Sequence, residues 1–543
     1  MSKKTVCVIG AGVCGLPAAK WAVQYGFEPT VLEAQSQLGG LWNYKEEETE
    51  FSTVMKQTVI NTSKEMSAYS DFVPNPEDAN YMHHSKLWKY LDRYAEVNGL
   101  RKFIKFRHYV KNVERATDYD RTGNWVVHFT DDNGSSQQKT YNFVLVCTGH
   151  HATPHFPKPW PGQEQWKGRI VHSHSYKKPV GYDDKTVLVV GIGNSAVDVA
   201  CELSRSAQQV YISTRRGAWI NAKHTKNGYP NDMAFNRRYI GLIKWLSPDL
   251  LNKMSEKRFT EFFDHDEYGL RPKHKVLAQH PTICDEIHNK ISSGTVIVKG
   301  DIKQFNATGV VFEDGSFADV DEVVLCTGFS FSFPYLDNGN LVPVIDNRVE
   351  LYKKMFPPNS ADKNTLACIG LVQPIGSIMA PAEMQVRVFY EQALGNLQLP
   401  SKAEMLRDIK TSNENMLRRY INVPRHTIQI DYVDYMDEMS SMIGAKPPLT
   451  RLFFTDFELW NKLIFGPNVP YVYRLAGPFP WPEAREAIMG VEERRIKGIH
   501  KRETPNDPLK PLRKSDGASL YTWAIAVLVV LLIVWYFRGL VNK

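Results

Sequence analysis

The sequence has few cysteines, and none of them are closely spaced. Seven are scattered through 543 residues, an odd number with no Cys-x-x-Cys pair among them. They are Cys7, Cys14, Cys147, Cys201, Cys284, Cys326 and Cys368. This distribution argues against a disulfide-stapled secreted domain and against a paired-thiol redox motif. We therefore expect free, buried thiols in a reducing compartment.

The sequence also lacks low-complexity tracts, short tandem repeats and a strong charge imbalance. Its net charge of +7 and its charged fraction of 23% are ordinary for a chain of this length. Nucleic acid is therefore not an expected partner, and no metal site is predicted. Basic residues concentrate only between residues 494 and 514, directly before the last apolar segment. The length allows about three domains with substantial cores and is compatible with an oligomer.

One long uncharged apolar run, Leu520–Phe537, stands near the C-terminus. As a helix its 18 residues would be about 27 Å long, enough to cross a bilayer. Aromatic residues stand at both of its ends and basic residues precede it, so we expect residues 516–543 to form a single-pass tail anchor. A buried core helix is the alternative. Residues 1–19 resemble a secretory signal peptide, but the glycine motif described next needs them, so we expect no cleavage.

A glycine-rich motif follows the first predicted strand, Thr5–Ile9. It reads Gly10-Ala11-Gly12-Val13-Cys14-Gly15, and the next predicted strand, Pro29–Leu32, ends at the acid Glu33. The glycines Gly10, Gly12 and Gly15 allow a tight turn and a close approach of the backbone to a pyrophosphate. The Glu33 carboxylate would bind both hydroxyls of a ribose but repel a 2′-phosphate. The motif therefore predicts FAD or NAD.

A second motif of the same kind is followed by the basic residues Arg215 and Arg216 instead of an acidic residue. After Thr186–Val190 the chain reads Gly191-Ile192-Gly193-Asn194-Ser195-Ala196, and the next predicted strand is Val210–Ser213. Arginine offers a planar fork for the 2′-phosphate that NADPH carries and NADH lacks. We therefore predict an NADPH site. Its expected residues are Gly191, Gly193, Asn194, Ser195, Thr214, Arg215 and Arg216.

An internal echo indicates how the two nucleotide domains are connected. The segment Val144–Gly149 recurs nearly unchanged as Val323–Gly328. We interpret the first copy as the strand on which the chain leaves the first domain, and the second copy as the strand on which it returns. The predicted fold is α/β, with two Rossmann-like dinucleotide-binding domains, the NADPH domain inserted in the FAD domain, plus a C-terminal transmembrane helix. The expected boundaries are 1–153 and 323–444 for the FAD domain, 154–322 for the NADPH domain, and 445–515 for a loop-rich region with a basic linker.

Residues 217–294 exceed what a minimal nucleotide-binding unit requires, and we treat them as an insertion. The insertion is rich in aromatic and apolar residues, as in Tyr239–Leu246. It either covers the active site or touches a membrane, or it forms an extra packed helical layer. Gln373–Met379 is a second candidate to line access to the site.

The segment between the two motifs carries a family resemblance. Residues 166–176 resemble the fingerprint of flavin-containing monooxygenases, with Gly168, His172 and Tyr176 in place and Trp166 replacing the usual first Phe. The related Baeyer-Villiger monooxygenases end this fingerprint with Trp, so Tyr176 favours the branch that oxidises nitrogen and sulfur. Further segments resemble animal microsomal, NADPH-dependent dimethylaniline monooxygenases: Gly39–Trp42, Asn61–Met66, Ser213–Trp219, Tyr268–His274, Gln279–Thr282 and Arg425–Gln429.

The resemblance implies an oxidoreductase that binds FAD and NADPH and consumes molecular oxygen. NADPH would reduce the flavin, and a hydroperoxyflavin would then transfer oxygen to a lone pair on nitrogen or sulfur. Asn61 would be the catalytic residue, since its amide donates a hydrogen bond to the peroxide without supplying an acid that promotes peroxide loss. By the same resemblance Gly40, Leu41, Trp42 and Thr62 join Asn61 in binding the cofactors. The expected substrates are lipophilic amines or sulfur compounds, as in xenobiotic metabolism, at the cytosolic face of the endoplasmic reticulum membrane.

Alternatives stay open for single residues and for the function. Thr62–Glu65 is also a capping-box pattern, which would make Asn61 a turn residue. His172 is either catalytic or, as we favour, couples the domains near the bound nicotinamide nucleotide. For the function, the alternatives are Baeyer-Villiger ketone oxygenation, an NADPH oxidase that releases hydrogen peroxide, an electron-transfer reductase, and a flavoprotein that senses redox state without turnover.

Overall fold

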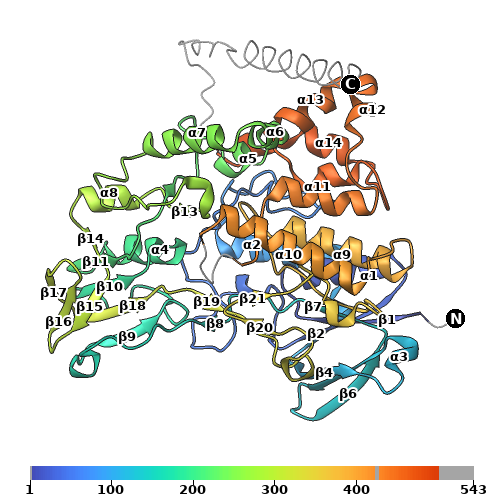
Figure 1. The fold of residues 1–543 in the computed structure, drawn as a ribbon, viewed down its shortest axis with the longest axis horizontal. Helices are drawn as coiled ribbons and strands as arrows, with labels where there is room; N and C mark the ends of the chain where they lie inside the picture. The colour runs from blue at the N-terminus through green and yellow to red at the C-terminus, as the bar shows by residue number, and fades with distance from the viewer. Residues whose placement is uncertain (1–2, 422–426, 501–543) are drawn as a thin grey trace. The chain divides into compact units, whose positions relative to one another are not determined.

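Two five-stranded parallel sheets form the framework of the chain. The computed structural model describes residues 3–421 and 427–500, and Figure 1 shows their fold. The strand order is β22-β7-β1-β2-β3 in the first sheet and β14-β11-β10-β18-β9 in the second. Neighbouring strands are parallel throughout both sheets. The predicted α/β class with two Rossmann-like sheets is confirmed.

The first sheet carries the first glycine motif at the end of its central strand. Its strands are β22 (Leu366–Cys368), β7 (Phe143–Val146), β1 (Thr5–Ile9), β2 (Glu28–Glu33) and β3 (Ile104–Phe106). The apolar runs of β1 and β7 are buried, as expected for strands covered on both faces. Helix α1 (Gly15–Gln24) begins at the last glycine of the motif and packs against α9 (Met379–Ala393). The core therefore holds the start of α1 in place.

The second sheet repeats this arrangement around the second motif. Its strands are β14 (Val296–Lys299), β11 (Gln209–Ser213), β10 (Thr186–Val190), β18 (Glu322–Leu325) and β9 (Arg169–His172). Helix α4 (Asn194–Leu203) begins inside the motif, and its buried Ala196, Val197 and Ala200 share a core with Val187 and Ile212. The strand, glycine turn and helix thus follow each other as the sequence predicted.

Each five-stranded sheet and its helices form one unit, and each unit contains a three-stranded antiparallel sheet at the equivalent position in its strand sequence. The strands β4 (Tyr109–Arg115), β5 (Trp125–Thr130) and β6 (Ser136–Tyr141) lie between β3 and β7. The strands β15 (Ile302–Phe305), β16 (Gly309–Phe312) and β17 (Phe317–Asp319) lie between β14 and β18. Strands β7 and β18 are therefore equivalent strands of two similar units.

This equivalence shows that the segment Val323–Gly328 is not the strand on which the chain returns to the first domain. Strand β18 pairs with β10 and β9 in the second sheet, so the domain boundary placed at residue 323 is wrong. The strand that returns to the first sheet is β22, beside β7. The echo recurs because each copy closes against a glycine motif: a Cβ added at Gly10 would lie 2.8 Å from the Cys147 carbonyl oxygen, and one at Gly191 2.5 Å from that of Cys326. Both glycines have positive φ, so both turns need the same close fit.

The expected insertion is mainly a packed helical layer between β11 and β14. Its elements are β12 (Ile220–Asn221), α5 (Asn231–Phe235), α6 (Arg238–Leu246), α7 (Pro248–Thr260), the 3₁₀ helix Val276–Ala278, β13 (Thr282–Ile283) and α8 (Ile287–Ser292). Helix α6 packs against α7 and against α13 (Phe457–Phe465), as Figure 1 shows at the top of the view. The insertion therefore joins the helices that follow residue 430.

The region after residue 445 is more helical than its prolines and aromatics predicted. Its helices are α12 (Leu449–Thr455), α13, the 3₁₀ helix Pro470–Arg474, α14 (Ala484–Met489) and α15 (Val491–Lys497). They follow α11 (Tyr432–Met442), while the remaining helices α2 (His84–Val97), α3 (Tyr119–Thr122) and α10 (Lys402–Arg419) lie earlier in the chain. Asp456 starts α13 as an N-cap, since its carboxylate accepts a hydrogen bond from the Leu459 N–H at 3.1 Å. The loop-rich prediction is therefore wrong between residues 449 and 465.

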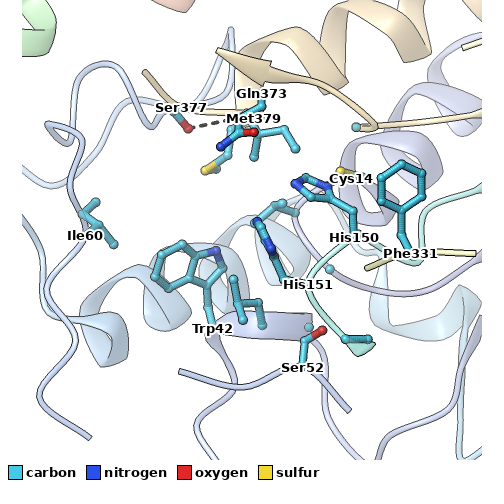
Figure 2. A pocket seen from close by; sticks show the side chains of 18 of the residues that line it. Cys14, Trp42, Ser52, Ile60, His150, His151, Phe331, Gln373, Ser377 and Met379 are labelled. Carbon is cyan, nitrogen blue, oxygen red and sulfur yellow. Dashed lines mark hydrogen bonds between the residues drawn. The ribbon is translucent and has the colours of Figure 1, made fainter. Parts of the chain in front are cut away.

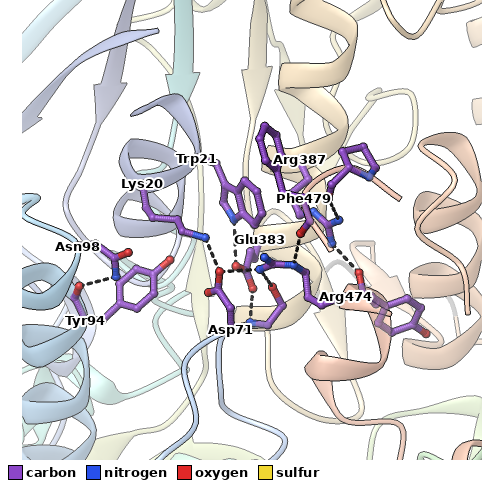
Figure 3. A network of polar contacts seen from close by, with 12 residues as sticks. Lys20, Trp21, Asp71, Tyr94, Asn98, Glu383, Arg387, Arg474 and Phe479 are labelled. Atoms are coloured by element: carbon purple, nitrogen blue, oxygen red, sulfur yellow. Dashed lines mark hydrogen bonds and ion pairs between the residues drawn. The ribbon is translucent and has the colours of Figure 1, made fainter. Parts of the chain in front are cut away.

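A buried polar network fixes this C-terminal region to the first unit (Figure 3). The Asp71 carboxylate accepts hydrogen bonds from Lys20 of α1 and from Arg474, each at 2.6 Å. The indole N–H of Trp21 donates to Glu383 of α9 at 2.9 Å. Removing one charge from such a network would leave the others buried and unpaired, which is strongly destabilising.

The predicted membrane span Leu520–Phe537 and the linker before it lie outside the described residues. Within the two described ranges, no helix is both long and apolar enough to cross a membrane.

Candidate functional site

A cavity of about 1100 Å³ extends from the first glycine motif to Asn194 of the second. Many of the predicted site residues line it: Gly10, Gly12, Glu33, Gly40, Leu41, Trp42, Asn61, Thr62 and Asn194. The others do not reach its wall: Gly15, Gly191, Gly193, Ser195, Thr214, Arg215 and Arg216. A ligand that extends from one motif to the other would therefore lie in a single space.

Glu33 is oriented by the backbone at the end of β2. Its two carboxylate oxygens accept hydrogen bonds from the N–H groups of Ala11 at 2.7 Å and Gln35 at 2.8 Å. Burial raises the pKa of Glu33, and the two backbone hydrogen bonds oppose that rise. The carboxylate is thus held beside the glycine turn with lone pairs left for further donors, as the predicted contact with ribose hydroxyls requires.

Arg215 and Arg216 stand exposed where β11 ends. Neither forms an ion pair with another residue in the described ranges. The adjacent Thr214 hydroxyl accepts a hydrogen bond from the Gly217 N–H at 3.1 Å, which shapes the turn. The two guanidinium groups are therefore free to meet a phosphate, and their NADPH contact stays a prediction.

Asn61 presents an unsatisfied polar atom at the cavity wall. Its side-chain oxygen is buried, and no described residue hydrogen-bonds to it. Such atoms are rare in folded proteins and are commonly satisfied by a bound group. The capping-box interpretation of Thr62–Glu65 is wrong, because no helix begins there and Glu65 instead binds Arg494 at 2.8 Å.

Asp232 is a cavity residue that the sequence did not reveal. It lies in α5 of the insertion, and its Oδ2 accepts hydrogen bonds from the Ser63 N–H at 2.6 Å and the Ser63 hydroxyl at 2.8 Å. Its Oδ1 accepts one from the Met233 N–H at 2.9 Å. Burial raises the pKa of Asp232 to about 6, although these hydrogen bonds lower it. The insertion thus fixes the loop that carries Asn61, a long-range pairing with no local sequence signal.

The fingerprint residues 166–176 are mainly structural. A Cβ added at Gly168 would lie 2.1 Å from the Trp166 ring and 2.5 Å from the Asp321 carbonyl oxygen, so only glycine fits beneath this aromatic ring. The Tyr176 hydroxyl donates to Glu202 of α4 at 2.8 Å. The fingerprint therefore packs β9 and its turn against the rest of the unit built on the second sheet, which we call the NADPH-side unit after its predicted ligand.

His172 of the fingerprint also lines the cavity. Its Nδ1 accepts a hydrogen bond from the His174 N–H at 3.1 Å, which leaves Nε2 to donate to the Gly328 carbonyl at 3.0 Å. Burial lowers its pKa to about 4, so the ring is neutral at neutral pH. With both nitrogens engaged, the ring couples β9 to the turn after β18 within one unit, and its expected role in coupling the two domains stays a prediction.

The other wall of the cavity combines aromatic, histidine and apolar side chains (Figure 2). His150 and His151 have ring centroids 4.2 Å apart; His151 is exposed to the cavity, and desolvation by the surrounding chain lowers its pKa to about 4. Gln373 and Met379, from the segment expected to line access to the site, lie across the space from Trp42. This wall is uncharged at neutral pH and suits an apolar guest.

Comparison with known proteins agrees with the geometry. The sequence model of the family described as flavin-binding monooxygenase-like matches residues 3–537. Flavin-containing monooxygenase 5 of Rattus norvegicus is 43% identical over 534 residues, covering 98% of each chain. Dimethylaniline monooxygenase (N-oxide-forming) 2 of Mus musculus is 42% identical over 544 residues, covering 99% of each chain.

Solved structures share the fold at lower identity. The S-allyl-L-cysteine S-oxygenase of Allium sativum has a TM-score of 0.63 and 22% identity, covering 92% of this chain and 99% of its own. An oxidised steroid monooxygenase bound to NADP has a TM-score of 0.59 and 16% identity, covering 84% of this chain and 99% of its own. The two glycine turns and the unsatisfied Asn61 oxygen fit two bound nucleotides. The chain therefore belongs to the flavin-binding monooxygenase-like family and is an NADPH-dependent flavin monooxygenase with FAD and NADPH as its cofactors.

Proposed function

We propose that this chain oxygenates soft nucleophilic nitrogen and sulfur centres of lipophilic small molecules. The observation that carries the proposal is the single cavity, in which the first glycine motif, Asn194 of the second motif and Asn61 meet apolar side chains that include Trp42 and Phe331. The murine relative at 42% identity is named for forming an N-oxide of dimethylaniline, a lipophilic amine. Sulfur in a thioether presents the same kind of accessible lone pair.

The proposal gives each part of the cavity wall a task. FAD, when bound, supplies the oxygen-activating chemistry. The first glycine motif and Glu33 hold its adenosine end, and the second motif with Arg215 and Arg216 holds NADPH. Asn61 lines the space between them, and Asp232 keeps the Asn61 loop in position. The reaction needs no general base from the protein, because the substrate attacks with its own lone pair.

The protonation state of the substrate is expected to control its turnover. Desolvation lowers the pKa values of His150, His151 and His172, so these side chains add no positive charge at neutral pH. A protonated amine lacks the lone pair that the reaction uses. Turnover of a basic amine is therefore expected to fall as the pH drops below the pKa of the amine.

A competition experiment tests the substrate class. The purified enzyme receives NADPH, oxygen, and equal concentrations of an aryl methyl thioether and a cyclic ketone. The proposal predicts sulfoxide as the main product. Lactone as the main product would contradict it, and peroxide equal to the NADPH consumed would show that neither compound is a substrate.

We also propose that Leu520–Phe537 anchors the chain in the endoplasmic reticulum membrane, with residues 1–500 in the cytosol. The length and flanks of the run support this anchor, and the highly exposed Trp245 and Phe454 are suited to contact a membrane surface. After an alkaline wash, the full chain should stay with the membrane and a chain ending at residue 515 should be released. Release of both would refute the anchor, and retention of both would assign binding to the exposed apolar side chains.

A further inference from the structure

Two cysteines that are far apart in the sequence meet in the NADPH-side unit. Cys201 lies in α4 and Cys284 directly follows β13, and their sulfur atoms are 3.9 Å apart across 83 positions of the chain. Both are free thiols, each about 6% exposed. Their spacing in the sequence gave no sign of a pair. A disulfide bond would require the two sulfur atoms to approach to about 2.0 Å.

The surroundings of the pair differ for its two members. The Cys284 sulfur accepts hydrogen bonds from the Cys201 S–H and from the backbone N–H groups of Glu286 and Ile287, and its pKa is lowered mainly by the Cys201 contact. Burial opposes this lowering of the pKa, and the charge of Asp198 opposes it to a smaller degree. The pKa of Cys201 is raised, because its proton is shared with Cys284. Cys284 therefore loses its proton more readily than Cys201.

The other five cysteines lack this combination. Burial raises the pKa of every one of them: Cys7, Cys14, Cys147, Cys326 and Cys368. All seven cysteines are buried, so exposure does not distinguish a reactive one. The thiolate is the reactive form of cysteine, and only Cys284 combines a lowered pKa with a second thiol beside it.

We propose that Cys201 and Cys284 form a peroxide-reactive dithiol site that closes to an intramolecular disulfide. The Cys284 thiolate attacks one oxygen of hydrogen peroxide; an S–O bond forms, the O–O bond breaks, and the leaving hydroxide takes up a proton to become water. The Cys201 sulfur then attacks the sulfenic acid on Cys284, forming the S–S bond and releasing the second water. The two thiols lose two electrons, and one peroxide becomes two waters.

The disulfide would join the insertion to the NADPH-side helix where the two already meet. The Thr282 hydroxyl donates to the Ile192 carbonyl at 2.7 Å, and the Ile283 N–H donates to the Asn194 side chain at 2.9 Å. Asn194 begins α4 and lines the cavity. The bond would therefore lock β13 to the second glycine motif, and it would also restrict the unfolded chain across a long loop.

Peroxide titration of the full-length holoenzyme tests the proposal. After each addition the peroxide is removed, free thiols are alkylated in denaturant, and peptides are examined by mass spectrometry. The expected first product is a Cys201–Cys284 cross-linked peptide, with two of the seven thiols lost and both restored by dithiothreitol. The oxidised enzyme should also unfold at a higher temperature than the reduced enzyme.

Three serine variants make the assignment specific. Cys284→Ser should leave Cys201 reduced, while Cys201→Ser should leave a sulfenic acid on Cys284 that a dimedone reagent traps. Cys326→Ser is the matched control, because Cys326 shares the same core and is 8% exposed, and its disulfide yield should equal the wild type. Bound flavin content checks that each variant is folded. Oxidation of other cysteines before this pair, or oxidation of Cys201 in Cys284→Ser at the same peroxide dose as in the wild type, would overturn the proposal.

Discussion

At the scale of single residues, the cavity wall depends on side chains from distant segments. Asn61 lies early in the chain, and Asp232, which holds the neighbouring Ser63, comes from the insertion. The resemblance identified Asn61 and its loop, because these residues form a contiguous segment. It could not identify Asp232, because only the folded chain brings that carboxylate to Ser63.

Asp232→Asn tests this link. Asparagine has one acceptor oxygen, so it cannot replace the carboxylate toward both Ser63 and Met233 without turning an NH₂ group toward a donor, at a cost of about 1–3 kcal/mol. We expect several-fold more hydrogen peroxide released per NADPH consumed in the presence of a thioether. Asp285→Asn, which removes the same charge from the insertion at a carboxylate bonded to the Lys223 N–H, is the control. Unchanged coupling in Asp232→Asn would show that Asp232 does not position Asn61.

The exposed arginines after β11 give a second residue-level prediction. If both bind the 2′-phosphate of NADPH, losing these charged hydrogen bonds costs about 1.5–3 kcal/mol each. Replacing both Arg215 and Arg216 by alanine should raise the KM for NADPH by at least about tenfold and leave that for NADH unchanged. Arg205→Ala removes an exposed arginine paired with Glu286 and should change neither value. An equal rise in the KM for NADPH and for NADH would show that these arginines do not bind the 2′-phosphate.

At the scale of elements, the fingerprint around β9 explains why a short motif marks the family. Trp166 covers Gly168, His172 bonds the turn after β18, and Tyr176 bonds α4. The motif therefore reports a packing arrangement that holds the NADPH-side unit together. Its sequence pattern survives because each position has a steric or hydrogen-bonding requirement.

Gly168→Ala should disturb that packing. Its Cβ would overlap the Trp166 ring and the Asp321 carbonyl, and forced overpacking of this kind costs about 1–3 kcal/mol. We expect a thermal unfolding midpoint several degrees below that of the wild type. Gly300→Ala is the matched control, since no atom lies within 4 Å of its added Cβ. Equal midpoints for the two variants would contradict the packing role.

The elements show where sequence reasoning succeeds and where it fails. The strands Thr5–Ile9 and Thr186–Val190 were predicted with their bounds, because a buried apolar run followed by a glycine turn has few alternatives. The return at residue 323 was misplaced, because similar strands in two sheets have similar sequences. The helices between residues 449 and 465 were missed, because aromatic and proline content obscured the Asp456 cap. Both errors concern features that depend on contacts between segments far apart in the sequence.

At the scale of the whole molecule, histidines with lowered pKa values make the fold sensitive to acid. Among the described residues, eight histidines have lowered pKa values: His84, His150, His151, His172, His224, His265, His280 and His288. Desolvation is the main cause for each. Four carboxyl groups have raised pKa values and act in the opposite direction: Glu33, Asp198, Glu202 and Asp232.

The histidines outnumber these carboxyls, so acid should destabilise the native state. A histidine whose folded pKa is lowered contributes its full stability above the ordinary pKa of 6.5, and that stability is lost as the pH falls toward the folded pKa, about 4 for His172. The urea midpoint should therefore fall steadily between pH 6.5 and 4. His172→Gln should give a shallower slope, because one proton is no longer taken up on unfolding. A midpoint that stays constant from pH 7 to pH 5 would be incompatible with this expectation.

The central claim concerns the whole molecule: one cavity holds both nucleotides, so that NADPH reduces the FAD of its own chain. The most direct measurement is the anaerobic bleaching of the bound flavin after rapid mixing with NADPH or NADH, followed at several enzyme concentrations. We predict bleaching by NADPH at a rate constant that does not depend on enzyme concentration, with NADH much slower at the same concentration. A purified chain without flavin, or bleaching by NADH as fast as by NADPH, would contradict the account.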